Sequence, residues 1–178
     1  MRITAGVLRG RILKVPDITG LRPTPSKVRQ AMFNILGPVE DMSVLDLFSG
    51  SGVMALEALS RGAANALSIE KNRSLTQRLS AIRMAWGLES QWQIKTASVE
   101  KGLAALAGNS FDLIFADPPY QQGFCENIPT WLDSFEIGCA QLIIEESSRM
   151  QPVWPTGWQC AQSRRYGDTT LHFLSRLP

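Results

Sequence analysis

The chain has 178 residues, of which 44% are hydrophobic and 19% are charged. This length and composition are typical of one globular domain with a substantial buried core. No apolar run is long enough to cross a bilayer and residues 1–4 do not begin a signal peptide, so we expect a cytoplasmic protein with no membrane partner. Three cysteines and one histidine, without metal-ligand spacing, argue against a metal site.

The first 29 residues are strongly basic. They carry seven basic residues against one acidic residue, a charge of +6, whereas the remainder carries −4. A basic segment on a mildly acidic body indicates a surface that binds phosphate groups, with a solvated arm as the alternative. We expect a short hairpin from residues 2–8 and 11–15, with Arg9 in its turn and Arg11 at the start of its second segment.

A helix is expected next, with Ser26 as its N-terminal cap and Leu36 near its end, because apolar residues recur along one face. The chain then passes through a Gly-Pro pair and its pattern changes to alternating strands and helices. We therefore divide it into a basic N-terminal extension, residues 1–37, and a main domain, residues 38–178.

The main domain is predicted to be a Rossmann-like α/β fold. Strands are expected near residues 43–48, 66–70, 92–96, 111–116 and 140–145. Helices are expected near residues 53–61, 72–86, 98–107 and 124–136, the last disturbed by Pro129. Residues 158–163 and 169–174 indicate a closing hairpin. Repeated strand–helix units predict a mostly parallel sheet whose ligands bind at the carboxyl ends of the strands.

A glycine-rich loop follows the first of these strands. Ser49, Gly50 and Gly52 belong to it, and the glycines let backbone N–H groups approach a ligand closely. Asp46, just before the loop, is unfavourable near a phosphate but favourable near an ammonium group. Glu70, at the end of the next strand, can accept both hydroxyls of a ribose. The combination favours S-adenosylmethionine over a dinucleotide, and an NAD-type site is the alternative.

The sequence Asp117-Pro118-Pro119-Tyr120 ends the strand near 111–116. The prolines fix an extended backbone and carry no N–H, so the loop offers only acceptors, the Asp117 carboxylate and backbone carbonyls. Tyr120 adds a flat face beside them. This arrangement suits a planar heterocycle whose exocyclic NH2 group must be held and deprotonated, whereas the alternative is an ordinary proline-rich turn.

The chain resembles the RsmD-type bacterial methyltransferases over nearly its whole length. The matching stretches are residues 6–11, 22–36, 45–63 and 117–120, with Tyr166-Gly167 also fitting. The most specific part is the Arg-Pro-Thr element at 22–24 with the helix that follows. The resemblance implies a class I methyltransferase fold with a seven-stranded sheet, S-adenosylmethionine as cofactor, and methylation of N2 of one guanine in small-subunit (16S) ribosomal RNA.

Residue pattern and resemblance together assign the site. The catalytic residues expected are Asp117, Pro118 and Tyr120. The cofactor-binding residues expected are Asp46, Ser49, Gly50, Gly52, Glu70, Ala97, Ser98 and Asp117. The RNA-binding residues expected are Arg9, Arg11, Arg22, Thr24, Arg29, Tyr120 and Tyr166. Members of the family often carry Asp or Asn for the cofactor adenine after the third strand, where this chain has Thr96-Ala97-Ser98, so the Ala97 backbone or the Ser98 hydroxyl is the candidate there.

The sequence is also compatible with other functions. A DNA methyltransferase acting on adenine N6 could use the same loop, although the chain shows no separate target-recognition domain. A non-catalytic RNA-binding module would be expected to lack the acids at the strand ends, and the basic extension disfavours a small-molecule methyltransferase. We expect a monomer whose partner is 16S ribosomal RNA, either alone or within an assembling 30S particle.

Overall fold

The computed structural model describes residues 1–14 and 25–177, so two expected RNA contacts, Arg22 and Thr24, lie outside the described residues. The strands are β1 Ser43–Leu47, β2 Asn65–Glu70, β3 Trp92–Thr96, β4 Ser110–Ala116, β5 Gly138–Ser147, β6 Trp158–Tyr166 and β7 Thr169–Arg176. The helices are α1 Ser26–Leu36, α2 Val53–Ser60, α3 Arg73–Ala85, α4 Val99–Ala104 and α5 Phe124–Ser134.

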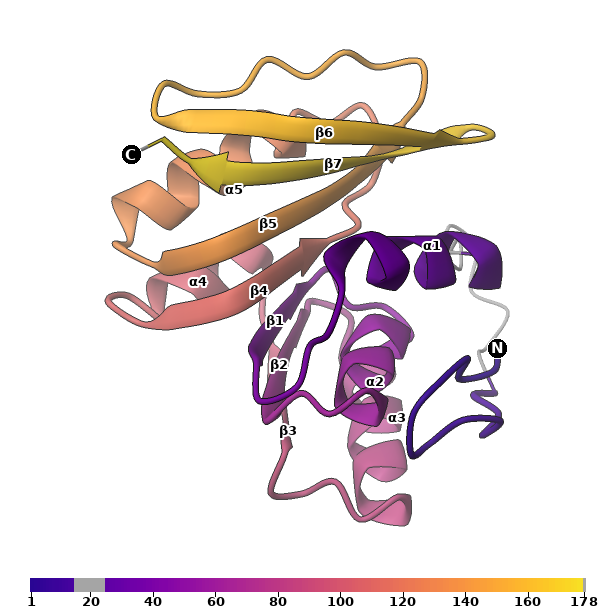
Figure 1. The fold of residues 1–178 in the computed structure, drawn as a ribbon. Coiled ribbons are helices and arrows are strands. Elements are labelled where there is room, and N and C mark those ends of the chain that lie inside the picture. The colour runs from indigo at the N-terminus through magenta and orange to yellow at the C-terminus, as the bar shows by residue number, and fades with distance from the viewer. Residues whose placement is uncertain (15–24, 178) are drawn as a thin grey trace.

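The strands form one sheet in the order β3-β2-β1-β4-β5-β7-β6 (Figure 1). Neighbouring strands from β3 to β5 run parallel, whereas β7 pairs antiparallel with both β5 and β6. The predicted fold, a mostly parallel sheet closed by an antiparallel hairpin, is confirmed. The helix α5 runs unbroken through Pro129.

Each face of the sheet has its own hydrophobic core. Val44 packs in the core that α1, α2 and α3 cover, whereas Leu45 and Leu47 pack in the core that α4 and α5 cover. Parallel strands are buried on both faces, which explains why β1 is a nearly continuous apolar run. Asp46 is the exception in that run, and it is 1% exposed.

The N-terminal extension is less regular than the expected hairpin. Residues 1–14, called the arm below, contain one isolated antiparallel bridge, Arg2 to Ile12. The middle of the arm instead lies against the C-terminal end of α2, where the Ser60 carbonyl accepts from the Val7 amide at 2.7 Å. Gly6 is required there because a Cβ would lie 1.6 Å from the Ser60 oxygen, at a φ of +76°.

A buried carboxylate fastens the arm and α1 to α2. Glu57 is fully buried and accepts from the Thr4 amide and hydroxyl, both at 2.9 Å, and from Arg29 Nε at 3.4 Å. Arg29 is 1% exposed, and its guanidinium also donates to the Arg2 carbonyl at 2.9 Å. The expectation that Arg29 contacts RNA is therefore wrong, because its side chain is committed to the core.

The start of α1 also differs from expectation. Ser26 is the first helical residue, Pro25 precedes it, and no side chain caps the helix. The Ser26 hydroxyl instead accepts from the Arg29 guanidinium at 3.4 Å. The arm and α1 contribute Ile3, Leu13 and Met32 to the core beneath α2. The division of the chain into an extension and a main domain at residue 37 stays a prediction.

Replacing Glu57 tests this anchor. Glu57→Ala leaves the Arg29 guanidinium buried without its carboxylate, and we expect the free energy of unfolding to fall by about 3–5 kcal/mol. Urea denaturation followed by circular dichroism measures the change. The control is Glu89→Ala, which removes an exposed carboxylate and should change stability by less than about 0.5 kcal/mol. Equal stabilities of the two variants would show that the buried pair is not an anchor.

Candidate active site

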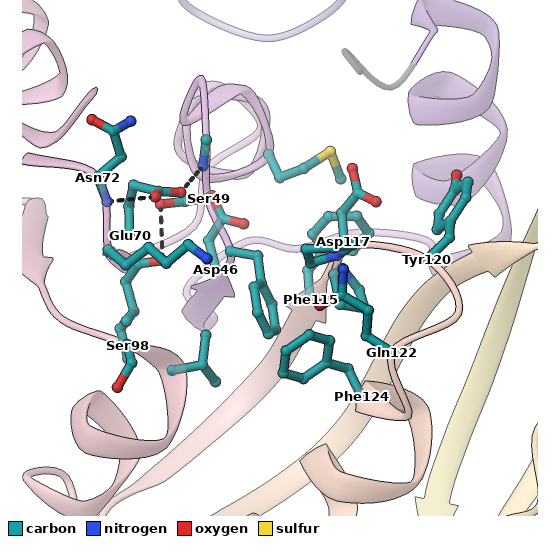
Figure 2. A pocket seen from close by; sticks show the side chains of 18 of the residues that line it. Asp46, Ser49, Glu70, Asn72, Ser98, Phe115, Asp117, Tyr120, Gln122 and Phe124 are labelled. Carbon is teal, nitrogen blue, oxygen red and sulfur yellow. Dashed lines mark hydrogen bonds between the residues drawn. The ribbon is translucent and has the colours of Figure 1, made fainter. Parts of the chain in front are cut away.

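A cleft of about 1000 Å³ opens at the carboxyl ends of the strands β1 to β5 (Figure 2). The structure brings eight of the predicted site residues together in its lining: Asp46, Ser49, Gly50, Glu70, Ser98, Asp117, Pro118 and Tyr120. They come from four separate stretches of the chain. The parallel sheet gathers them because the strands that precede them all end at one edge.

Glu70 is held in a fixed position on one side of the cleft. Glu70 is 9% exposed. Its carboxylate accepts from the backbone N–H of Gly50 at 2.9 Å and from the backbone N–H of Asn72 at 2.8 Å (Figure 2). Asn72 in turn caps α3 through its side chain. Glu70 is thus a preorganised acceptor that joins the glycine-rich loop to the end of β2, and the alternative of a solvated charge does not apply.

Asp46 lies deeper in the cleft. Burial is the main reason why the pKa of its carboxyl is raised to about 8. Hydrogen bonds from the Ala55 amide and the Ser68 hydroxyl oppose this increase in pKa, and the negative charge of Glu70 adds to it. The Ser68 oxygen accepts from the Trp92 indole at 3.0 Å, which leaves the hydroxyl proton available to Asp46. The atom Oδ2 of Asp46 is buried and has no hydrogen-bond partner among the described residues. A ligand cation fits this atom.

Two consecutive glutamates hold the loop that begins at Asp117. On one face of the sheet, Tyr120 donates its hydroxyl to Glu145 at 3.1 Å and lies 2.9 Å from the Thr169 hydroxyl. On the other face, Glu146 accepts from the Gln121 amide at 3.4 Å. Both carboxylates are 3% exposed. Burial raises the pKa of the Tyr120 phenol, so it remains a donor at neutral pH.

Aromatic side chains form an apolar wall beside Asp117. Phe48, Phe115 and Phe124 line the cleft, and Phe124 lies near Asp117 (Figure 2). The rings of Phe48 and Phe124 meet edge to face with centroids 4.9 Å apart. Phe48 also has a positive φ of 56°, which is uncommon for a bulky residue and typical of functional loops. This wall suits the face of a planar ring.

The sequence did not indicate these aromatic residues, nor Asn72, Glu145 or Glu146, as parts of the site. The apolar residues resemble ordinary core positions of strands and helices. A pair of acids at the end of the strand near 140–145 was the one available signal, because strand ends line the cleft in this fold.

Two expected cofactor residues do not line the cleft. Gly52 precedes α2 as its N-cap, and a Cβ there would lie 2.8 Å from the side chains of Leu79 and Trp92, so this glycine permits close packing. The Ala97 amide donates to the Glu70 carbonyl at 3.1 Å and is not available to a ligand. Of the two candidates for the adenine contact, only Ser98 is among the residues that line the cleft.

The remaining expected RNA contacts lie outside the cleft lining. Arg9 and Arg11 are exposed on the arm, with the Arg11 guanidinium 5.1 Å from the Trp86 ring. Tyr166 is half-buried at the end of β6 and packs against the core. Within residues 1–14 and 25–177, no cluster of His, Cys, Asp and Glu side chains could hold a metal ion. In the same residues, no helix is long and apolar enough to span a bilayer.

The strand order, the closing hairpin and the position of the cleft define the fold class of S-adenosylmethionine-dependent methyltransferases. A solved structure described as putative methyltransferase yhhF from Escherichia coli superposes with a TM-score of 0.86 at 33% identity, over 99% of this chain and 97% of that one. The putative methylase HI0767 from Haemophilus influenzae gives a TM-score of 0.83 at 26% identity, over 99% and 98% of the two chains.

The family described as "Conserved hypothetical protein 95" matches residues 1–175. Ribosomal RNA small subunit methyltransferase D from Escherichia coli K12 is 34% identical over 180 residues, which cover 99% of this chain and 90% of that protein. The putative rRNA methyltransferase YlbH from Bacillus subtilis is 34% identical over 77% of this chain and 76% of that protein. The chain belongs to this family, and the RsmD-type resemblance is confirmed.

The raised pKa of Asp46 predicts that cofactor binding depends on pH. The cofactor ammonium requires the carboxylate, so binding should release a proton, and affinity should rise by up to about tenfold per pH unit as pH approaches 8. Titration calorimetry at pH 6, 7 and 8 measures the cofactor affinity. Repeating it in buffers of different ionisation enthalpy gives the number of protons released on binding. Asp46→Asn should bind more weakly and release no proton from this site. Equal wild-type affinity at pH 6 and pH 8 would contradict the prediction.

The same shift has a consequence for stability. The unfolded chain loses this proton near pH 3.8 and the folded chain near pH 8. The carboxyl therefore makes the ligand-free protein less stable as pH rises between these values. Asp46→Asn should remove that contribution.

The position of Glu70 predicts a second effect on cofactor binding. Glu70→Ala removes the acceptor for the ribose hydroxyls, and charge-assisted hydrogen bonds of this kind contribute roughly 1.5–3 kcal/mol. We expect the cofactor Kd to rise about tenfold or more in calorimetry. Glu70→Gln keeps one acceptor oxygen, so its cofactor Kd should lie between those of the wild type and Glu70→Ala. Glu89→Ala serves as the surface control. A wild-type Kd in Glu70→Ala would exclude a ribose contact.

Proposed function

We propose that this protein methylates the exocyclic N2 amine of a guanine in small-subunit (16S) ribosomal RNA, with S-adenosylmethionine as methyl donor. The observation that carries the proposal is the loop from Asp117 to Tyr120, whose prolines carry no N–H and whose Asp117 carboxylate and Pro118 carbonyl are acceptors, and which lines the same cleft as Asp46 and Glu70. Support comes from the relative of 34% identity, named ribosomal RNA small subunit methyltransferase D, which this chain matches over 99% of its length.

The residues present fit the cofactor. Glu70 would accept the ribose hydroxyls, and the Oδ2 atom of Asp46, buried without a partner among the described residues, would face the ammonium group. Ser98 lies on the adjacent wall, where it can contact the adenine. When bound, S-adenosylmethionine supplies a methyl group that its sulfonium already activates, so the protein has mainly to position and orient the reactants.

The target amine needs acceptors on the protein. The lone pair of guanine N2 is delocalised into the ring, which makes the amine a poor nucleophile. Hydrogen bonds from its two N–H groups to the Asp117 carboxylate and the Pro118 carbonyl would pyramidalise the nitrogen and direct its lone pair. Asp117 would then accept the proton that the amine loses once it becomes cationic.

The planar base needs flat surfaces. Tyr120 is restrained through its hydroxyl, and Phe124 lies on the adjacent wall, so the two rings can hold a base beside Asp117. Stacking of this kind contributes roughly 1–3 kcal/mol in sites for single strands. The base has to be unpaired or flipped to enter the cleft.

The arm would supply affinity for the RNA backbone. Arg9 and Arg11 are exposed and would contact phosphates, which position the RNA without reading its sequence. Arg22 and Thr24 are proposed to lie near the target base on the strength of the family resemblance. We propose that the protein acts as a monomer, in the cytoplasm, on ribosomal RNA alone or within an assembling 30S particle.

Replacing Asp117 tests the proposal. Asp117→Ala should abolish methyl transfer while the cofactor Kd stays within a few fold, because the carboxylate acts on the amine. The assay incubates unmodified ribosomal RNA with labelled cofactor and identifies the product by nucleoside mass spectrometry. Asp117→Asn keeps an acceptor oxygen but has no charge, and it separates hydrogen bonding from proton removal.

Three outcomes contradict different parts of the proposal. N2-methylguanosine is the expected product. In a parallel incubation with DNA, N6-methyl-2′-deoxyadenosine would instead favour a DNA methyltransferase that acts on adenine. Full turnover by Asp117→Ala would exclude Asp117 as the amine acceptor. Transfer to no nucleic acid by the wild-type protein would refute the proposed function itself.

A further inference from the structure

We propose that the end of the β6–β7 hairpin and Arg149, in the loop after β5, form a second RNA-binding surface, which holds phosphates on the far side of the cleft from the arm. The surface consists of three arginines, Arg149, Arg164 and Arg165, and is called the turn patch below. The inference rests on the proposed function, because RNA is its ligand. It extends that function by assigning phosphate contacts to a part of the chain whose overall charge is negative.

The topology places the turn patch at the edge of the cleft. Strand β7 runs antiparallel to β5 and pairs Thr169 with Ser147, so the turn before Thr169 lies at the edge where the parallel strands end. The Ser148 amide donates to the Asp168 carbonyl at 2.8 Å and fastens the turn to the loop after β5. Asp168 and Arg149 line the same cleft as Asp117.

The three arginines have charge available for a ligand. All are exposed, and none forms an ion pair with a described residue. Arg164 and Arg165 each donate one hydrogen bond to a nearby carbonyl, of Ser163 at 3.3 Å and of Gly167 at 3.0 Å. These bonds restrain the guanidinium groups without neutralising them, and an ordered guanidinium is well suited to a phosphate.

The neighbouring acids do not cancel this charge. Glu145 and Glu146 are 3% exposed and are engaged with Tyr120 and with the amides of Gln121 and Ser147. Asp168 is the one exposed acid within residues 163–169. The turn therefore presents a net positive charge at the cleft entrance.

The register shows how the patch is arranged. Arg164 lies opposite Leu171, whose side chain is in the core beneath α1 and α2, so Arg164 projects on the sheet face that carries α1. Arg165 lies opposite Thr170 and projects on the other face. The patch thus surrounds the end of the hairpin, and a strand passing over the end can contact both side chains.

The arm lies at the opposite end of the site. Leu13 and Lys14 border a small cavity together with Gly50 and Ser51 of the glycine-rich loop. Figure 1 shows the arm beside α2 and α3 and the β6–β7 turn on the far side of α1. A strand whose flipped base reaches Asp117 would therefore have phosphates near the arm in one direction and near the turn patch in the other.

The test compares RNA binding across a salt series. The double variant Arg164→Ala/Arg165→Ala leaves every residue of the cleft lining in place. Each lost phosphate contact should lower the magnitude of the salt slope by roughly 0.7–0.9, or about 1.4–1.8 for the pair. Filter binding uses protein-free ribosomal RNA, and calorimetry with S-adenosylmethionine should give an unchanged cofactor Kd.

Matched variants sharpen the test. Lys101→Ala removes an exposed charge from α4 and should leave the slope unchanged, in contrast to Arg165→Ala alone. Arg164→Lys/Arg165→Lys keeps both charges and should restore most of the slope. Combination with Arg9→Ala/Arg11→Ala should lower the slope by the sum of the two effects, because distant sites act independently.

Several results would overturn the inference. One is a wild-type salt slope in the Arg164/Arg165 double variant. Another is an equal decrease of the salt slope in Lys101→Ala, which would show that the slope depends on the net charge of the protein and not on the position of the arginines. A loss seen only with assembled particles would assign the patch to a protein partner instead. Failure of the proposed function is seen separately, as the absence of methyl transfer by the wild-type protein, and the salt slopes remain interpretable in that case.

Discussion

The carboxylate of Glu57 lies in the core and yet carries a full set of charged and polar partners. It accepts from Thr4 and Arg29, and Arg61 Nε lies 3.5 Å from it. Arm, α1 and α2 meet at this one group. A buried carboxylate without such partners would be strongly unfavourable, so the arm and α1 have to be in place for α2 to pack against the sheet. The surface that is proposed to bind RNA is in this way built on the same helix that follows the glycine-rich loop.

The cleft also depends on buried carboxylates and their hydrogen-bond partners. Asp46 and Glu70 are both buried acids, but they are treated differently by their surroundings. Glu70 receives two backbone amides and is fixed, whereas one oxygen of Asp46 is left without a partner among the described residues and its pKa rises. One acid is satisfied before a ligand arrives and the other is not. Glu70 therefore holds the wall of the cleft in a fixed position, whereas the Asp46 carboxylate gains a favourable interaction only when a cation binds.

Much of this architecture could be predicted from the sequence. The alternation of apolar runs and amphipathic segments predicts the seven strands and five helices found in the described residues, and the acids at strand ends predict the cleft. The errors have physical causes. Arg29 has the same residue type as the exposed arginines, and only the fold brings Glu57 beside it. Gly52 fits a ligand-binding loop by its position, but its contacts with Leu79 and Trp92 come from distant segments. The roles of Phe124, Glu145 and Glu146 depend on how neighbouring strands and helices are placed, which local patterns do not encode.

The docking of the arm on Ser60 has a consequence for motion. The arm is held on the rest of the protein by the amides of Val7 and Leu8 on Ser60, by the carboxylate of Glu57 and by its buried side chains Ile3 and Leu13, rather than through a sheet. The Val7 and Leu8 amides share one partner residue, Ser60, so separation of the arm from α2 breaks both bonds. Hydrogen exchange at the Val7 and Leu8 amides should therefore report one common opening event, with less protection than the strands of the core. Opening of the arm would also take the Thr4 amide and hydroxyl away from the buried carboxylate of Glu57, so movement of the surface that is proposed to bind RNA is coupled to the packing of α2.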